Sequence, residues 1–173
     1  MADDRAPAQE VLETTNPEQL KALAHPLRNR IIFALGAEGA TVSQLAKSLA
    51  TNKGNVAHHL AVLEHAGLVR RGERRQVRGG TEQYFVRAAR RLRTPGGSRA
   101  GHTAALMQAV ADEIDGSPTD ALLNLRRIRL TRQQAASLAA HLERLVDELP
   151  EAGPREATHG VLVSVFQSGR APR

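Results

Sequence analysis

The stretch from Thr41 to Leu68 constrains the fold of this chain most, because it has the pattern of two short helices joined by a tight turn. Thr41 and Gln44 have the spacing of a capping box, in which two side chains satisfy backbone N–H groups at the start of a helix. The apolar residues that follow fall on one side of that helix: Val42, Leu45, Ala46 and Leu49. A first helix is therefore predicted to begin at about residue 42.

The second half of this stretch predicts a longer helix. Thr51 and Asn52 are suitable N-cap residues. Gly67 can end the helix, because glycine adopts the left-handed conformation at little steric cost. The apolar residues between these ends recur at helical spacing: Val56, Leu60 and Leu63. Two helices that share one apolar seam across a tight turn predict a helix-turn-helix motif.

The outward face of the second helix is the candidate surface for reading DNA bases. At 100° per residue, this face lies opposite Val56 and is rich in glycine and alanine, which lets the backbone approach a duplex closely. Side-chain donors are concentrated near the start of the helix, so base contacts are expected from Asn52, Lys53, Gly54, Asn55 and His58. His59 lies nearer the apolar side and is expected to be a packed, hydrogen-bonded histidine.

Composition excludes several classes of protein. The chain has 173 residues and no cysteine, which excludes disulfides, thiolate metal sites and thiol catalysis. No apolar run approaches the roughly 20 residues that cross a bilayer, and the acidic start is not a signal peptide. A cytoplasmic protein without membrane contact is expected.

Positive charge is concentrated directly after the second helix. Residues 66–99 contain ten Arg and two Glu, a net charge of +8, whereas residues 1–65 and residues 100–173 each have a net charge of −1. A merely solvated arginine surface would spread this charge along the chain. The concentration instead favours a polyanionic partner, with double-stranded DNA the expected one.

The same basic region has the pattern of a β-hairpin. Two short β-compatible runs, residues 68–71 and 82–87, flank a polar tip rich in glycine and arginine. Arg74, Arg75 and Arg78 are expected in that tip, within reach of backbone phosphates or a minor groove. A nucleotide site is not favoured, because no GxxxxGK[ST] pattern and no helix start follow the glycines.

The remaining chain suggests four parts. Residues 1–15 lack periodicity and are expected to be a flexible arm. Residues 16–93 form the DNA-binding domain, in which Pro26 begins a second helix after a first one that starts at Pro17. Thr94 to Ala100 is a turn-rich linker. Residues 101–173 are expected to form a smaller region for dimerisation or sensing.

The C-terminal region is predicted to follow a helix-strand-helix-strand order. Helices are expected at 101–115 and 132–149, where apolar residues recur at helical spacing. Alternating apolar residues predict strands at 121–130 and 159–167, the second apolar on both faces. The predicted fold class is α+β, mainly α, with a winged helix-turn-helix domain ahead of this smaller region.

Catalysis and metal binding find little support in the sequence. The carboxylates Asp112, Glu113 and Asp115 have no partner histidine or serine at a meaningful spacing, so a solvated helix face explains them. No catalytic residue and no cofactor is assigned, and an enzyme is the least favoured class. The seven histidines are scattered, and without thiolates no metal site is predicted, although a zinc or nickel site shared across a dimer stays chemically possible.

Three segments together resemble one family of regulators. HPLRNRIIFALG, HHLAVLEHAGLV and RGGTEQYFV are similar to the corresponding parts of arsenical-repressor (ArsR-like) winged helix-turn-helix regulators, over about residues 17–93. The chain resembles the longer members, which carry an α/β extension. The resemblance implies a homodimer, a recognition helix at 53–59 in the major groove, and a wing at 74–81 on the flanking backbone. Ala57 departs from the serine found in many members, which removes an expected hydroxyl contact.

Three functions follow as hypotheses. The favoured one is a dimeric, sequence-specific transcriptional regulator that acts as a repressor, with helices near 17–24, 101–115 and 132–149 at the dimer interface. A winged helix that binds RNA or the nucleoid without sequence preference is the second. A winged helix that acts as a protein-interaction module is the third, and the +8 segment argues against it. A small organic effector in the C-terminal half is the expected switch.

Overall fold

The computed structural model describes residues 9–36, 39–94, 101–119, 121–150, 152–153 and 156–167. The chain divides into two compact units, Met1–Ala121 and Leu122–Arg173. This division differs from the expected one, because the helix that follows the linker belongs to the first unit. Apart from Thr94, the linker predicted at 94–100 lies outside the described residues.

The first unit contains five helices and five strands within the described residues. In chain order these are β1 (Gln9–Glu13), α1 (Pro17–Leu23), α2 (Pro26–Ala34), β2 (Ala40–Thr41), α3 (Val42–Ser48), α4 (Lys53–His65), β3 (Val69–Val77), β4 (Gly80–Arg87), β5 (Ala89–Arg93) and α5 (His102–Asp115). The second unit contains α6 (Arg132–Asp147). The mixed fold with a winged helix-turn-helix domain confirms the predicted class, α+β and mainly α.

The helix-turn-helix forms at the residues that its capping signals predicted. Thr41 Oγ1 accepts a hydrogen bond from the Gln44 N–H at 3.3 Å, and Gln44 Oε1 accepts one from the Thr41 N–H at 2.8 Å, so α3 begins with a complete capping box. Gly67 has a φ of 69°, the left-handed conformation that ends α4. The apolar seam of the two helices packs into one core with α2, β3 and β4.

Side chains at the start of α2 form hydrogen bonds across the junction between α1 and α2. His25 caps α2, because its Nδ1 accepts a hydrogen bond from the Leu27 N–H at 3.2 Å. The Arg28 guanidinium donates to the carbonyls of Lys21 and Ala22, and buried Asn29 donates to the carbonyl of Leu23 at 2.9 Å. These donors add partners to the carbonyls at the end of α1, of which that of Lys21 also accepts from the Ala24 N–H. The predicted break between two consecutive helices at Pro26 is confirmed.

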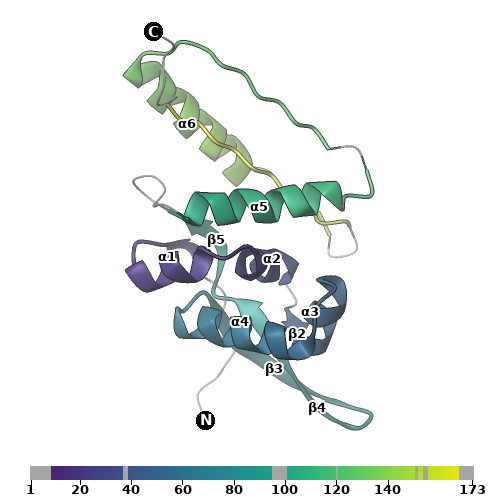
Figure 1. Cartoon of the computed structure of the whole chain (residues 1–173). Coiled ribbons are helices and arrows are strands. Elements are labelled where there is room, and N and C mark those ends of the chain that lie inside the picture. Colours follow the sequence, from purple (N-terminus) through teal and green to yellow (C-terminus); the bar gives the residue numbers. More distant parts are fainter. Residues whose placement is uncertain are drawn as a thin grey trace. The chain divides into compact units, whose positions relative to one another are not determined.

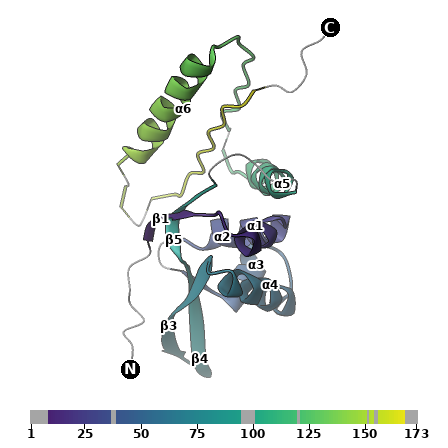
Figure 2. The same cartoon turned by 90° about the vertical axis from the view of Figure 1, so that its left-hand side faces the viewer.

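Two small sheets complete the first unit. The larger is antiparallel in the order β2-β4-β3, and the smaller pairs β1 with β5 in parallel. Figure 2 shows β1 beside β5. The prediction of a flexible arm at 1–15 is therefore wrong for Gln9–Glu13, which pairs with a strand about 80 residues away. Residues 1–8 lie outside the described residues.

Helix α5 packs on α1 and α2 through small side chains. Ala105 and Ala109 are buried, and their small size lets α5 approach its neighbours closely. Arg30 of α2 lies 3.7 Å from Asp112 of α5, which adds an ion pair to this contact. The helix predicted at 101–115 therefore forms, but as part of the first unit's packing. In the described part of the chain, no helix is both long and apolar enough for a bilayer crossing.

The second unit has the predicted helix but not the two predicted strands. Helix α6 begins with a capping box between Thr131 and Gln134, as the sequence indicates. The strands predicted at 121–130 and 159–167 do not form: these segments are extended but have no strand partner among the described residues. Their alternating pattern suits a strand, and what is missing is a second backbone edge to pair with.

Candidate nucleic-acid interface

The first turn of α4 holds most of the residues predicted to read bases. Asn52 is the N-cap, and its Oδ1 accepts a hydrogen bond from the Asn55 N–H at 2.8 Å. The Asn55 side-chain amide donates to Thr51 Oγ1 at 3.2 Å, which fixes its orientation. Lys53 and Gly54 are exposed at the start of the helix, where the partial positive charge of the helix dipole favours an anion. The Asn52 oxygen is therefore engaged in positioning this turn.

The outward face of α4 consists mainly of small side chains, as predicted. Val56, Leu60 and Leu63 are buried, whereas His58 and the alanines at 57 and 61 are exposed. Gly54 and the two alanines leave room for a backbone or a base edge to approach α4. His58 is the one predicted base-reading residue beyond the first turn, and it lies on this open face.

The wing is longer than the sequence suggested, with a shift of register in β3 between Arg71 and Arg74. Strands β3 and β4 pair as far as Val77 and Gly80, so only Arg78 and Gly79 form the turn. Gly79 has a φ of 111° and Gly80 one of 152°, conformations that favour glycine. Arg74 and Arg75 therefore lie in β3, and the prediction that they belong to an irregular tip is wrong.

Arg74 and Arg75 point to opposite faces of the wing, because successive residues of a strand alternate. Arg74 pairs with Gln83, and its Nε donates to Gln83 Oε1 at 3.0 Å. Gln83 shares its face of β4 with buried Phe85, so Arg74 lies on the face that packs toward the helices. Arg75 lies on the other face, with its guanidinium 4.4 Å from the centre of the Tyr84 ring. The two arginines cannot contact one stretch of backbone from one face.

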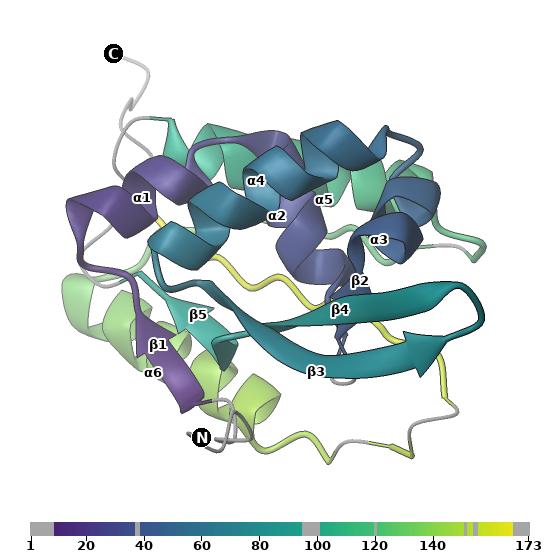
Figure 3. The ribbon, with the colours of Figure 1, turned by 90° about the horizontal axis from the view of Figure 1, so that it is seen from below.

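The hairpin turn and the start of α4 lie at the same end of the first unit. Figures 1 and 3 both show the wing projecting on the side where α3 ends and α4 begins. The base of the wing is tied to α4 by Arg71, whose Nε lies 2.9 Å from Glu64 Oε1. Sequence reasoning missed this ion pair, although the opposite charges on either side of the Gly67 turn were a signal for it.

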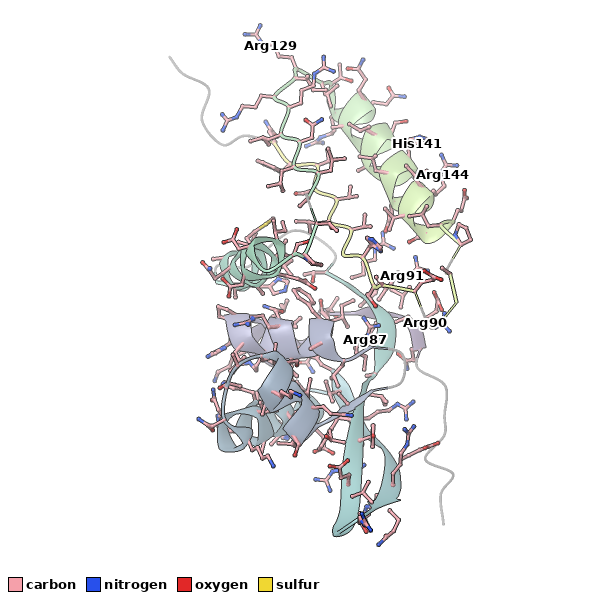
Figure 4. The ribbon with its side chains drawn as sticks, turned by 90° about the vertical axis from the view of Figure 1, so that its right-hand side faces the viewer. Arg87, Arg90, Arg91, Arg129, His141 and Arg144 are labelled. Atoms are coloured by element: carbon pink, nitrogen blue, oxygen red, sulfur yellow. The ribbon has the colours of Figure 1, made fainter. Side chains whose placement is uncertain are left out.

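The positive charge of residues 66–99 does not form a single surface. Arg90 and Arg91 lie in β5, and both approach Glu10 of β1, at 3.9 and 2.9 Å. Figure 4 shows these two side chains along β5, with Arg87 at the end of β4. Part of the basic segment therefore stabilises the contact between β1 and β5, and the wing carries the cations nearest to α4.

Three histidine rings form a cluster in which His59 of α4 lies near both His25 and His58. The rings of His25 and His59 are 4.5 Å apart, and those of His58 and His59 are 5.2 Å apart. Burial, followed by the charges of His25, Arg28 and His58, lowers the pKa of His59 to about 4. His59 is packed, as predicted, but its buried Nδ1 has no hydrogen-bond partner within the described residues, so the predicted bond at that atom is not confirmed.

This cluster predicts a loss of stability in mild acid. The fold favours the neutral form of His59, whereas the unfolded chain binds a proton at a higher pH. The contribution of His59 to the free energy of unfolding is therefore complete above pH 6.5 and falls as the pH drops toward 4. At 1.36 kcal/mol per pKa unit, the change from 6.5 to about 4 corresponds to at most roughly 3 kcal/mol, which solvent screening reduces. Urea unfolding of His59→Leu should show a smaller decrease between pH 7 and pH 5 than the unsubstituted protein. The control is His65→Leu, at an exposed position of the same helix, which should keep the original decrease; an equal decrease in all three proteins would contradict this account.

No group of three histidine or acidic side chains is placed to hold a metal ion in the part of the chain that the structure describes. Burial lowers the pKa of His102, which lies at the start of α5. His102, one of the histidines that a metal site shared across a dimer could use, is thus packed into the first unit. His141 and His159 belong to the second unit.

Comparisons with known proteins find a family match over the helix-turn-helix region. The helix-turn-helix domain family matches residues 23–72, and no curated protein matches the chain significantly. A homodimeric winged helix-turn-helix DNA-binding domain from Mycobacterium bovis, a possible ArsR-family regulator, is 30% identical, with 54% of this chain and 74% of that one covered and a TM-score of 0.33.

Two further solved structures are similar to parts of the chain. A transcriptional regulator homologue from Pyrococcus horikoshii is 25% identical over 56% of this chain and 87% of that one, with a TM-score of 0.33. Streptococcus pneumoniae FabT, solved in complex with DNA, is 18% identical over 73% and 72%, with a TM-score of 0.28. The matched family and the wing together make the first unit a winged helix-turn-helix domain, the fold of DNA-binding transcription regulators.

Proposed function

We propose that the protein is a dimeric, sequence-specific repressor of transcription of the ArsR-like type, which acts by occupying duplex DNA in the cytoplasm. The observation that carries this proposal is the position of the wing turn and the first turn of α4 at one end of the first unit (Figure 3). A helix in a major groove and a hairpin on the neighbouring backbone require this arrangement.

The two parts of this surface have different roles in the proposal. Lys53, Asn55 and His58 present donors that can contact base edges from α4. Arg74 and Arg78 contact phosphates, which adds affinity without reading sequence. The ion pair between Arg71 and Glu64 supports this division, because it fixes the base of the wing to the helix that it accompanies.

The dimer is proposed for two reasons. A single helix reads only a few base pairs, and a second copy related by a two-fold axis doubles the contacts and the specificity. The similar DNA-binding domain from Mycobacterium bovis is homodimeric. Repression is proposed from the resemblance to arsenical repressors, since occupancy of a promoter by such a dimer would exclude other proteins.

The test is a selection of bound duplex fragments from the source genome. We expect the bound fragments to share a motif with two inverted half-sites, about 10–10.5 base pairs between their centres or a multiple of that spacing. Strong binding with no shared motif would contradict the proposal and would favour non-specific binding of nucleic acid.

A further inference from the structure

The second unit has no buried side chain among its described residues, although its sequence is rich in apolar ones. Leu122 is 93% exposed and Phe166 is 71% exposed. The other exposed large apolar side chains of this unit lie in the two extended segments 121–130 and 159–167 and at or just after the end of α6: Leu123, Leu125, Ile128, Leu130, Leu145, Leu149, Val161, Leu162, Val163 and Val165. Exposed apolar surface on this scale is uncommon on a monomeric protein and marks an interface.

Within the part of the chain that the structure describes, the two extended segments also lack strand partners. Each alternates apolar and polar side chains over part of its length, one before and one after α6 in the chain, and Figures 2 and 4 show both as extended chain on the same side of α6. An extended segment without a neighbour presents a row of N–H and C=O groups that can pair with another strand. Isolated strands are not stable in water, and three or more are needed with an apolar face to cover.

We propose that the second unit acquires its core from a second copy of the chain, whose segments 121–130 and 159–167 pair with these to form one shared sheet against the two α6 helices. The proposal deepens the dimer of the proposed function and rests on it. We choose a second copy of the chain as the partner because it brings the same two extended segments and the same apolar side of α6. Two copies together give four strands and two helices that cover them.

The exposed area is of the size that such a dimer requires. The twelve apolar residues together expose the equivalent of about seven complete residues. Burial of one aliphatic side chain contributes about 1.5–3 kcal/mol at 25 cal/mol per Å², which corresponds to roughly 60–120 Å². One copy therefore offers roughly 400–800 Å², close to the roughly 800 Å² per partner of a stable interface. Backbone pairing of the segments adds further area.

The polar side of α6 stays free in this arrangement. Figure 4 shows His141 and Arg144 projecting from α6 on the side away from the extended segments. Ser137 and His141 are exposed and lie outside the stripe formed by Leu138, Leu142 and Leu145. Substitution on this polar side should therefore leave the shared core intact, which gives a control within the same unit.

Sedimentation equilibrium of the full chain tests the proposal. The unsubstituted protein is expected to be a dimer at low micromolar concentration. Leu125→Glu with Val163→Glu should raise the dimer dissociation constant at least 100-fold, because each charge would enter the shared apolar core. Ser137→Glu with His141→Glu adds the same two glutamates on the polar side of α6 and should change the constant less than threefold. A monomer at all concentrations, or equal effects of both variants, would overturn the proposal.

Hydrogen exchange separates strand pairing from other modes of association. The amides of residues 161–166 should be protected in the dimer and should exchange rapidly in the Leu125→Glu, Val163→Glu variant. Rapid exchange in an intact dimer would overturn the shared sheet. The proposed function can fail independently: a dimer with protected segments that selects no DNA motif would contradict the regulator and leave this assembly standing.

Discussion

A variant with Lys53→Ala and Asn55→Ala is expected to lose at least about 30-fold of its discrimination between a selected duplex and random DNA. Each base contact contributes about 1–3 kcal/mol of discrimination, and the variant removes two. The substitutions keep Asn52 and its cap at the start of α4, so the helix itself should remain. Competition binding at fixed salt measures the effect.

The wing provides the contrast to this variant. Arg74→Ala is expected to weaken binding to all duplexes alike and to reduce the slope of log affinity against log salt by roughly 0.9, the effect of one phosphate contact. Arg75→Ala, on the opposite face of β3 and over the Tyr84 ring, should change the slope little. If the α4 variant and Arg74→Ala caused the same uniform loss, the separate roles of helix and wing would be wrong.

Gly39→Ala is expected to destabilise the first unit by about 2–5 kcal/mol. Gly39 has a φ of +72°, which costs a residue with a Cβ about 1–2 kcal/mol. The added Cβ would also lie 2.4 Å from the Phe85 carbonyl oxygen and 2.6 Å from Val86 Cγ1. Relief of that overlap requires β2 to move away from β4, at a cost of about 1–3 kcal/mol. Urea unfolding measures the change.

Gly36→Ala is the matched control for this substitution. Gly36 has nothing within 4 Å of the position of an added Cβ, and its φ is not in the left-handed region. The same methyl group should therefore alter the free energy of unfolding by less than about 1 kcal/mol. If both substitutions changed the free energy of unfolding equally, the close contact of Gly39 with β4 would not be the cause of the destabilisation.

The parts of the fold that the sequence predicted are those decided by neighbouring residues. The capping box of Thr41 and Gln44, the glycine stop at Gly67 and the helix start at Pro26 each act within one helical turn. The buried and exposed sides of α4 followed from the same short-range periodicity. Lys53, Gly54, Asn55 and His58 accordingly lie on α4, with Asn52 as its N-cap, whereas base contacts by these residues stay a prediction.

Features that depend on distant residues were missed or misjudged. The pairing of β1 with β5 joins residues about 80 positions apart, and the short run Gln9–Glu13 carries no strong strand signal. Arg74 and Arg75 have modest strand propensity, and pairing with β4 overrides it. The alternation at 121–130 and 159–167 indicated strands, but a pattern cannot supply the second edge that a strand requires.

The central claim is sequence-specific recognition of duplex DNA by α4 and the wing, and competition titration of the unsubstituted protein tests it most directly. The two duplexes are the motif obtained by selection and a shuffled sequence of the same composition, at one physiological salt concentration. The account predicts that the selected duplex binds at least about 10³-fold more tightly, the lower bound for specific over non-specific binding. A ratio near one, at any affinity, would contradict it.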